Sequence, residues 1–355
     1  MKVADDLNEI LEDAVSIGAS DIHIVVGAKP RCRIYGVLKD MDYKEITDQV
    51  ANKLLMPQLD ALARSILGSE GSYDMAYHIN GVARFRVNIF KQKGALAGVF
   101  RVLNQNVPDY TSLGLPLSLF NLYKKRRGLI LVVGVTGSGK STTLASFVDV
   151  INKNLYKHII TLEDPIEYIH WHSRCIVNQR EIGNDVASFQ LGLRAALRED
   201  PDVILIGEMR DLDTIDTAMK AAETGHLVCS TLHTMGAVET INRIIDMYPE
   251  RQQKQARSTL EGVLEAVVAQ QLLPRKDRSG YVVAYEILFK NKEVKRYIRE
   301  GNIEGLEDYL NSKEAYNEGM CTMDNTILSL YNKDIISRET ALDYAFDKKD
   351  MMRKL

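Results

Sequence analysis

Residues 134–141 carry a pattern that can hold a phosphate chain. Gly134, Gly139, Lys140 and Ser141 satisfy the spacing G-x-x-x-x-G-K-[ST]. The glycines let backbone N–H groups curl around the phosphates, while the lysine neutralises β- and γ-oxygens and the hydroxyl holds Mg²⁺. The residues that we expect to bind the nucleotide are Gly134, Thr136, Gly137, Ser138, Gly139, Lys140, Ser141 and Thr142.

The sequence around this motif favours nucleotide binding over a purely structural glycine turn. An apolar run at 129–133 precedes it and a helical stretch follows. This is the strand–loop–helix setting that aims a helix N-terminus at an anion. No N-K-x-D segment that would read guanine follows, because "NKNL" at 152–155 lacks the aspartate. ATP is therefore the expected nucleotide, and a small-molecule kinase stays open as an alternative to a hydrolase.

Two apolar runs end in carboxylates that could serve hydrolysis. "DVILIGE" ends in Glu208, and Gly207 occupies the place where a Walker B motif usually has aspartate. Glu208 is then left to orient the attacking water or to reach Mg²⁺ through water. "HIITLE" ends in Glu163, followed by Asp164. Adjacent strands of one parallel sheet would place both strand-end carboxylates near the phosphate, and either Glu163 or Asp164 could complete the metal shell. The alternative for Glu208 is a solvated surface glutamate.

Two histidines, His226 and His233, bracket the apolar run "LVCSTL". An extended chain of that length separates them by roughly 23 Å, too far for one metal site. We expect His226 at the structural end of the strand and His233 at the functional end, where it would sense the γ-phosphate. A core or surface histidine is the alternative for each.

Three arginines lie on expected strands near the N-terminus. "RFRVN" contains Arg84 and Arg86, and "VFR" ends in Arg101. Arginines on an exposed sheet are often only solvated. An oligomeric ATPase, however, uses a cation supplied in trans to stabilise transition-state charge, and these three are the candidates.

The candidate site residues lie in two predicted domains. From residue 128, apolar runs alternate with helical stretches, which predicts an α/β domain with a mostly parallel sheet covered on both sides. After about residue 250 the pattern is mainly helical, with one strand, "YVVAYEIL". The first hundred residues predict a smaller α/β module whose last three strands form an antiparallel meander with turns at "NG" and "KG". The expected divisions are 1–104, a linker at 105–118, and 119–355.

The composition limits the partners. The chain has 355 residues and a net charge of −3, which gives no field for nonspecific nucleic-acid binding. The start "MKVADDLNEI" lacks the features of a signal peptide, and no apolar run approaches the roughly 18 residues that span a bilayer. We therefore expect a cytoplasmic protein that reaches the membrane only through another protein. The four cysteines, Cys32, Cys175, Cys229 and Cys321, show no metal-binding spacing and are expected to be reduced thiols.

Longer segments resemble one family. "TLEDPIEYIH" resembles the acidic box, and "REDPDVILIGEMRDLDTIDTAMKAAETGHLVCSTLHT" the Walker B and histidine boxes, of the ATPases of type II secretion and type IV pili. The resemblance extends from "ASDIHI" at 19 to "GMCTMD" at 319. "VKRYIREGN" at 294–302 resembles the "AIRNLIREGK" segment of PilT-type retraction ATPases, although residues 294, 295 and 297 depart from it. The four-cysteine zinc element of assembly-type relatives is missing.

The resemblance implies a homohexameric ring in which a PAS-like N-terminal domain packs against a RecA-like ATPase domain. It assigns Lys140 and Ser141 to phosphate and Mg²⁺, Glu163 to the acidic box, Glu208 to catalysis, and His226 and His233 to the histidine box. It implies ATP-driven depolymerisation and retraction of type IV pili through a platform protein in the inner membrane, acting indirectly on pilin. Alternatives are an assembly or auxiliary motor, a hexameric nucleic-acid translocase, and an ATP-sensing scaffold.

Overall fold

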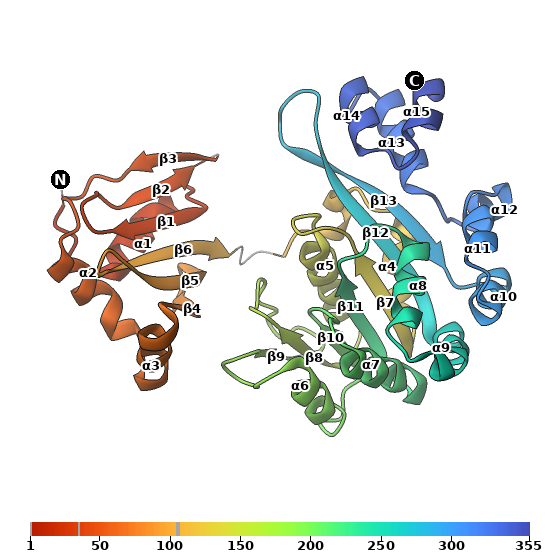
Figure 1. The fold of residues 1–355 in the computed structure, drawn as a ribbon, viewed down its shortest axis with the longest axis horizontal. Coiled ribbons are helices and arrows are strands. Elements are labelled where there is room, and N and C mark those ends of the chain that lie inside the picture. The colour runs from red at the N-terminus through yellow and green to blue at the C-terminus, as the bar shows by residue number, and fades with distance from the viewer. Residues whose placement is uncertain (1, 35, 104–106) are drawn as a thin grey trace. The chain divides into compact units, whose positions relative to one another are not determined.

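The computed structural model of the protein describes residues 2–34, 36–103 and 107–355. The chain forms two compact units, Met1–Asn106 and Val107–Leu355, whose elements are labelled in Figure 1. Residues 105 and 106 of the expected linker lie outside the described residues. The rest of that stretch opens the second unit and contains η2 (Tyr110–Leu113) and the start of α4 (Leu117–Phe120).

The first unit is a six-stranded sheet with three helices. All its strand pairs are antiparallel, in the order β3-β2-β1-β6-β5-β4. Its elements are α1 (Leu7–Ser16), β1 (Asp21–Val25), β2 (Arg31–Ile34), β3 (Val37–Asp40), α2 (Asp48–Leu55), α3 (Ala61–Glu70), β4 (Ser72–Ile79), β5 (Ala83–Gln92) and β6 (Ala95–Leu103). The expected meander is present, and Lys93 and Gly94 both have positive φ in the two-residue turn between β5 and β6, as a type I′ hairpin requires.

One face of this sheet forms the core of the unit. Ile22, Ile24, Phe85 and Phe100 are fully buried and pack with the apolar sides of α1, α2 and α3. Because side chains alternate along a strand, the residues between them lie on the opposite face. That second face carries the arginines of β5 and β6.

The second unit is built on a seven-stranded sheet in the order β13-β12-β7-β11-β10-β8-β9. All neighbouring strands are parallel except β12 and β13, the antiparallel pair at one edge of the sheet. The strands are β7 (Gly128–Val133), β8 (His158–Glu163), β9 (Ile176–Glu181), β10 (Val203–Ile206), β11 (Leu227–Leu232), β12 (Leu264–Pro274) and β13 (Tyr281–Phe289). β7, β10 and β11 are buried along their whole length, which explains their uninterrupted apolar sequence.

Helices cover both faces of this sheet, so the expected α/β fold class is confirmed in the second unit as in the first. α5 (Lys140–Asn154) packs on one face; α6 (Phe189–Ala196), α7 (Leu212–Thr224), α8 (Ala237–Asp246) and α9 (Glu250–Val263) belong to the core on the other. Six further helices follow: α10 (Lys292–Glu300), α11 (Ile303–Leu310), α12 (Lys313–Asn317), α13 (Met323–Asn332), α14 (Arg338–Tyr344) and α15 (Lys348–Lys354). Within the described residues, no helix has the length and apolarity needed to cross a bilayer.

One strand differs from the sequence prediction. The sequence predicts a single strand after residue 250, whereas the structure has β12 as well as β13. β12 is buried at nine of the first ten positions of its pattern BBBBBBBBiBe. Its sequence, LEAVVAQQLLP, has no two-residue alternation of apolar and polar side chains, so periodicity does not separate this strand from the helix that precedes it.

Candidate functional site

The phosphate-binding loop, residues 134–139, connects β7 with α5. Gly134 has φ +145°, and a Cβ there would collide with the carbonyl of Gln270 and the hydroxyl of Ser138, so only glycine fits. Gly139, with φ +90°, is the N-cap of α5 and offers no side-chain bond. The first N–H groups of this 15-residue helix are therefore left for an anion.

The hydrogen bonds of the Lys140 ammonium group indicate whether the loop fits a phosphate. Its side chain donates to the carbonyl oxygens of Gly134 and Val135, each at 2.9 Å, and the residue is only 8% exposed. An ammonium group has three donors, and the third has no partner among the residues that the structure describes. Burial lowers the pKa of Lys140, with nearby Glu208 and Glu167 opposing that shift. A phosphate oxygen would supply both the missing acceptor and a compensating charge.

A cavity of about 280 Å³ opens beside this loop. Among the residues expected to bind nucleotide, four line it: Thr136, Gly137, Lys140 and Ser141. Gly134, Ser138, Gly139 and Thr142 are not in its lining. Gly134 and Gly139 shape the loop, Ser138 is buried against Gly134, and Thr142 forms a 2.9 Å hydrogen bond with the hydroxyl of Tyr168.

Glu208 enters the cavity two residues after β10. Its Oε2 lies 3.3 Å from Nε2 of His233, which directly follows β11. Its Oε1 forms a 2.5 Å ion pair with Nη2 of Arg210. The Glu208 side chain is 12% exposed, whereas that of Arg210 is 71% exposed. This carboxylate is therefore contacted on one oxygen by a histidine and on the other by an exposed cation.

Gly207 has a packing reason for lacking a side chain. Its N–H donates to the carbonyl of Leu162 at 2.7 Å, and its carbonyl accepts from the Thr231 hydroxyl at 2.6 Å. A Cβ at this position would lie 3.2 Å from the Leu162 oxygen. An aspartate would thus be crowded between β8 and β11, and the carboxylate at this strand end comes from Glu208 instead.

Glu163 reaches the same cavity from the end of β8. Its Oε1 accepts hydrogen bonds from the Thr161 hydroxyl at 2.6 Å and from Nε2 of Gln179 at 3.0 Å. Burial raises the pKa of Glu163, an effect that these two donors oppose. Since β8 and β10 are neighbours, Glu163 and Glu208 end up beside one phosphate site with Ser141. Carboxylate and hydroxyl oxygens suit Mg²⁺, which would neutralise phosphate charge when bound.

The structure separates the two histidines. His233 follows β11 and lines the cavity, whereas His226 precedes β11 at the opposite end of the strand. Nδ1 of His226 lies 2.9 Å from the carbonyl oxygen of Ala221, at the end of α7. This contact closes the helix end, and the cavity lining does not include His226.

The three arginines all lie in the first unit, and their surroundings differ. Nε of Arg101 donates to Oδ1 of Asp21 at 2.9 Å. Arg86 lies directly across from Arg101 on the neighbouring strand and is exposed. Arg84 is partly buried and has a polar interaction of its own.

Several residues of the cavity were not predicted to act in the site. The cavity is also lined by Glu167, Tyr168, His170, Phe189 and Arg210. Burial lowers the pKa of His170 to about 4, so its imidazole is neutral at pH 7. All of them except Phe189 lie in the two segments quoted for the family resemblance, which was the signal that could have found them. Phe189, at the start of α6, has no such signal.

Comparisons with known proteins agree with this geometry. The family model described as "Type II/IV secretion system protein" matches residues 1–325. The type IV pilus retraction ATPase PilT of Pseudomonas aeruginosa is 39% identical over 340 residues, covering 96% of this chain and 98% of that protein. A twitching motility protein of Neisseria gonorrhoeae is 39% identical, covering 91% of this chain and 86% of its own length.

A solved structure is similar throughout. The crystal structure of the pilus retraction motor PilT with bound ADP is 44% identical in sequence and superimposes with a TM-score of 0.92. It covers 98% of this chain, which covers 99% of it. The similarity therefore includes both units and the phosphate-binding loop.

Proposed function

Because the chain belongs to the type II/IV secretion system protein family, we propose that it hydrolyses ATP to depolymerise and retract type IV pili. The observation that carries this proposal is the similarity over both units to pilus retraction ATPases, combined with a complete phosphate site. Lys140, Ser141, Glu163, Glu208 and His233 all line one cavity at the carboxyl ends of parallel strands. This is where α/β sheets place their ligands.

In the proposed reaction, the phosphate-binding loop and Lys140 hold the β- and γ-phosphates. Glu208 orients the attacking water. Nε2 of His233, which lies 3.3 Å from Oε2 of Glu208, would sense the γ-phosphate. Ser141 and Glu163 would hold Mg²⁺. His226 contributes through the end of α7 rather than through contact with the nucleotide.

The reaction also needs a cation for the charge that develops on the transferred phosphoryl group. We assign it to the first unit of a neighbouring subunit in a homohexamer, with Arg86 and Arg101 as the main candidates and Arg84 as the third. Arg86 is the freer of the two, since Arg101 is engaged by Asp21.

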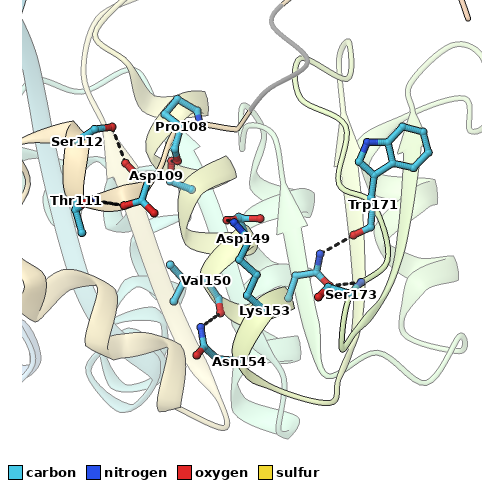
Figure 2. Close-up of polar contacts among 12 residues, drawn as sticks. Pro108, Asp109, Thr111, Ser112, Asp149, Val150, Lys153, Asn154, Trp171 and Ser173 are labelled. Atoms are coloured by element: carbon cyan, nitrogen blue, oxygen red, sulfur yellow. Dashed lines mark hydrogen bonds and ion pairs between the residues drawn. The ribbon is translucent and has the colours of Figure 1, made fainter. Parts of the chain in front are cut away.

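The motor is proposed to act in the cytoplasm at the inner face of the membrane, through a platform protein, and on pilin only indirectly. ATP binding and release would move one unit against the other at the linker 105–118. The described end of this linker is fastened to α5, because the Ser146 hydroxyl donates to the carbonyl of Pro108 at 2.7 Å. Figure 2 shows Pro108 beside Asp109, which caps the turn that follows.

The test is live imaging of labelled pili in cells whose only copy of the gene encodes Lys140→Ala. Loss of the ammonium removes phosphate binding, so we expect many long pili that never shorten. Cells without pili would instead mean that the same site drives assembly. Cells that extend and retract normally would contradict the proposed function altogether.

A further inference from the structure

Gln179, on β9, has a side chain whose polar atoms are all used. Its Nε2 donates to Oε1 of Glu163 at 3.0 Å and to the carbonyl oxygen of Tyr168 at 2.8 Å. Its Oε1 accepts from the backbone N–H of His170 at 2.8 Å. One amide thus joins the candidate catalytic carboxylate to the loop that follows it in the chain.

The partners fix which way this amide points. A backbone N–H can only donate, so the atom facing His170 must be the oxygen. The NH₂ group is therefore the one that faces Tyr168 and Glu163, and each of its two hydrogens has an acceptor. Together with the Thr161 hydroxyl, it fixes Oε1 of Glu163 and leaves Oε2 as the oxygen that these two donors do not use.

The same loop, residues 164–175, is held from its other side by α5. Thr142 bonds to the Tyr168 hydroxyl at 2.9 Å. Asn152 donates to the carbonyl of Trp171 at 2.7 Å and accepts from the N–H of Ser173 at 3.2 Å. Figure 2 shows the contacts at Trp171 and Ser173 and the Trp171 ring, which points away from them and is 78% exposed. The loop therefore has fixed positions on both β9 and the helix that begins at the phosphate site.

We propose that Gln179 is a positioning residue for ATP hydrolysis, whose amide orients the Glu163 carboxylate and fastens the loop 164–170 so that this carboxylate faces the nucleotide. This rests on the proposed function, in which Glu163 acts at the metal or the attacking water. Supporting residues of this kind typically contribute about 10- to 100-fold to activity.

The experiment compares two replacements of Gln179 with a matched control. Gln179→Met keeps the side-chain length and removes every hydrogen bond. Gln179→Glu keeps the acceptor for His170 but replaces the donor to Glu163 and to the Tyr168 carbonyl with a second carboxylate. Asn178→Met, on the same strand, removes only a 3.0 Å contact with His158. The kcat and the KM for ATP of the full chain are measured at one fixed pH, and the anisotropy of Trp171, the single tryptophan, reports the loop without nucleotide.

We expect kcat to fall about 10- to 100-fold in Gln179→Met and Gln179→Glu, with KM for ATP within about two-fold. Trp171 anisotropy should fall most in Gln179→Met, which loses every contact with the loop, and less in Gln179→Glu, which keeps the acceptor for His170. An equal loss of kcat in the two variants then separates orienting the carboxylate from holding the loop. Asn178→Met should match wild type in all three readings.

Two controls separate this proposal from the function on which it rests. If Lys140→Ala and Glu163→Gln abolish hydrolysis while both Gln179 variants keep the wild-type kcat, the positioning role is wrong and the ATPase stands. If Lys140→Ala hydrolyses ATP normally, the proposed function itself is wrong. A rise of KM for ATP in both Gln179 variants with kcat unchanged also overturns the positioning role, because it would assign Gln179 to nucleotide binding rather than to the orientation of Glu163.

Discussion

The two sheets of this protein place their polar side chains in different ways. In the second unit both faces of the sheet are covered by helices, so the charged residues near the strands gather at the strand ends. In the first unit all three helices belong to the core on one face, and the other face is left for charged residues. A doubly covered sheet can build a pocket at its edge, whereas a singly covered sheet offers a flat charged surface.

That surface contains one cross-strand row of particular interest. The register places Arg33, Asp21, Arg101 and Arg86 beside one another on β2, β1, β6 and β5. Asp21 is bonded to Arg101 at 2.9 Å and lies 3.8 Å from Arg33. Arg86 has no hydrogen bond or ion pair among the described residues. Like charges directly opposite each other destabilise a sheet. The proposed role of Arg86 and Arg101 at the nucleotide of a neighbouring subunit would place an anion beside this pair.

The largest expected effect is the recovery of ATPase activity when an inactive variant of the first unit is mixed with an inactive variant of the second. Glu208→Gln removes the water-orienting carboxylate of the second unit, and Arg101→Ala or Arg86→Ala removes the cation of the first. Each alone should lower kcat by about 10²-fold or more. If a site takes Glu208 from one subunit and the arginine from its neighbour, an equal mixture rebuilds a complete site at about a quarter of the interfaces.

The measurement is ATPase activity of coassembled chains over a series of mixing ratios. Recovery with one arginine variant but not the other identifies the residue that reaches the nucleotide. Mixed rings that stay inactive at every ratio, with both variants, would show that the two regions do not form one site in trans. Glu208→Gln mixed with Lys140→Ala is the control without recovery, since both lesions fall in the same unit.

The phosphate site could be predicted from the sequence because its chemistry is local. The spacing of Gly134, Gly139 and Lys140 already specifies a loop and a helix start, and the apolar runs before Glu163 and Glu208 indicate buried parallel strands. Neighbouring parallel strands then imply that their ends converge. The predicted residues that line the cavity, in the loop and at the strand ends, could therefore be found without knowledge of distant contacts.

The supporting residues could not be predicted because their roles depend on tertiary neighbours. Gln179 acts across a strand pair set by the register of β8 and β9. The sequence marks it only as part of "CIVNQ". The three arginines likewise look alike in the sequence. In the structure Asp21 engages Arg101, Arg84 is partly buried with a polar interaction of its own, and Arg86 is exposed. β12 was missed for a related reason, because burial on both faces removes periodicity.

A smaller effect is expected on the local unfolding free energy, which should differ between the Arg101→Ala and Arg86→Ala variants. Arg101→Ala leaves the mostly buried carboxylate of Asp21 with the Ser20 hydroxyl and, as its nearest cation, the more distant Arg33. This should lower the local unfolding free energy of the first unit by about 1 kcal/mol. Arg86→Ala removes a repulsion and should change it by less than about 0.5 kcal/mol. Native-state hydrogen exchange of amides in β1 and β6 measures both. Equal losses in the two variants would contradict the distinction between an engaged and a free arginine.

The smallest expected effect is the pH dependence of that difference. Burial alone would raise the pKa of Asp21, but hydrogen bonds from Arg101 and Ser20 outweigh it and hold the pKa below its ordinary value. The stability from this pair is therefore fully present above the unfolded pKa of about 3.9 and is lost as pH falls through the lower folded value. The gap between wild type and Arg101→Ala in hydrogen exchange should stay constant from pH 7 to about pH 5 and then shrink. In an Asp21→Asn background, which cannot titrate, the effect of Arg101→Ala should be small at every pH. A gap that persists undiminished in strong acid would mean that Arg101 stabilises the sheet through packing of its side chain rather than through its charge.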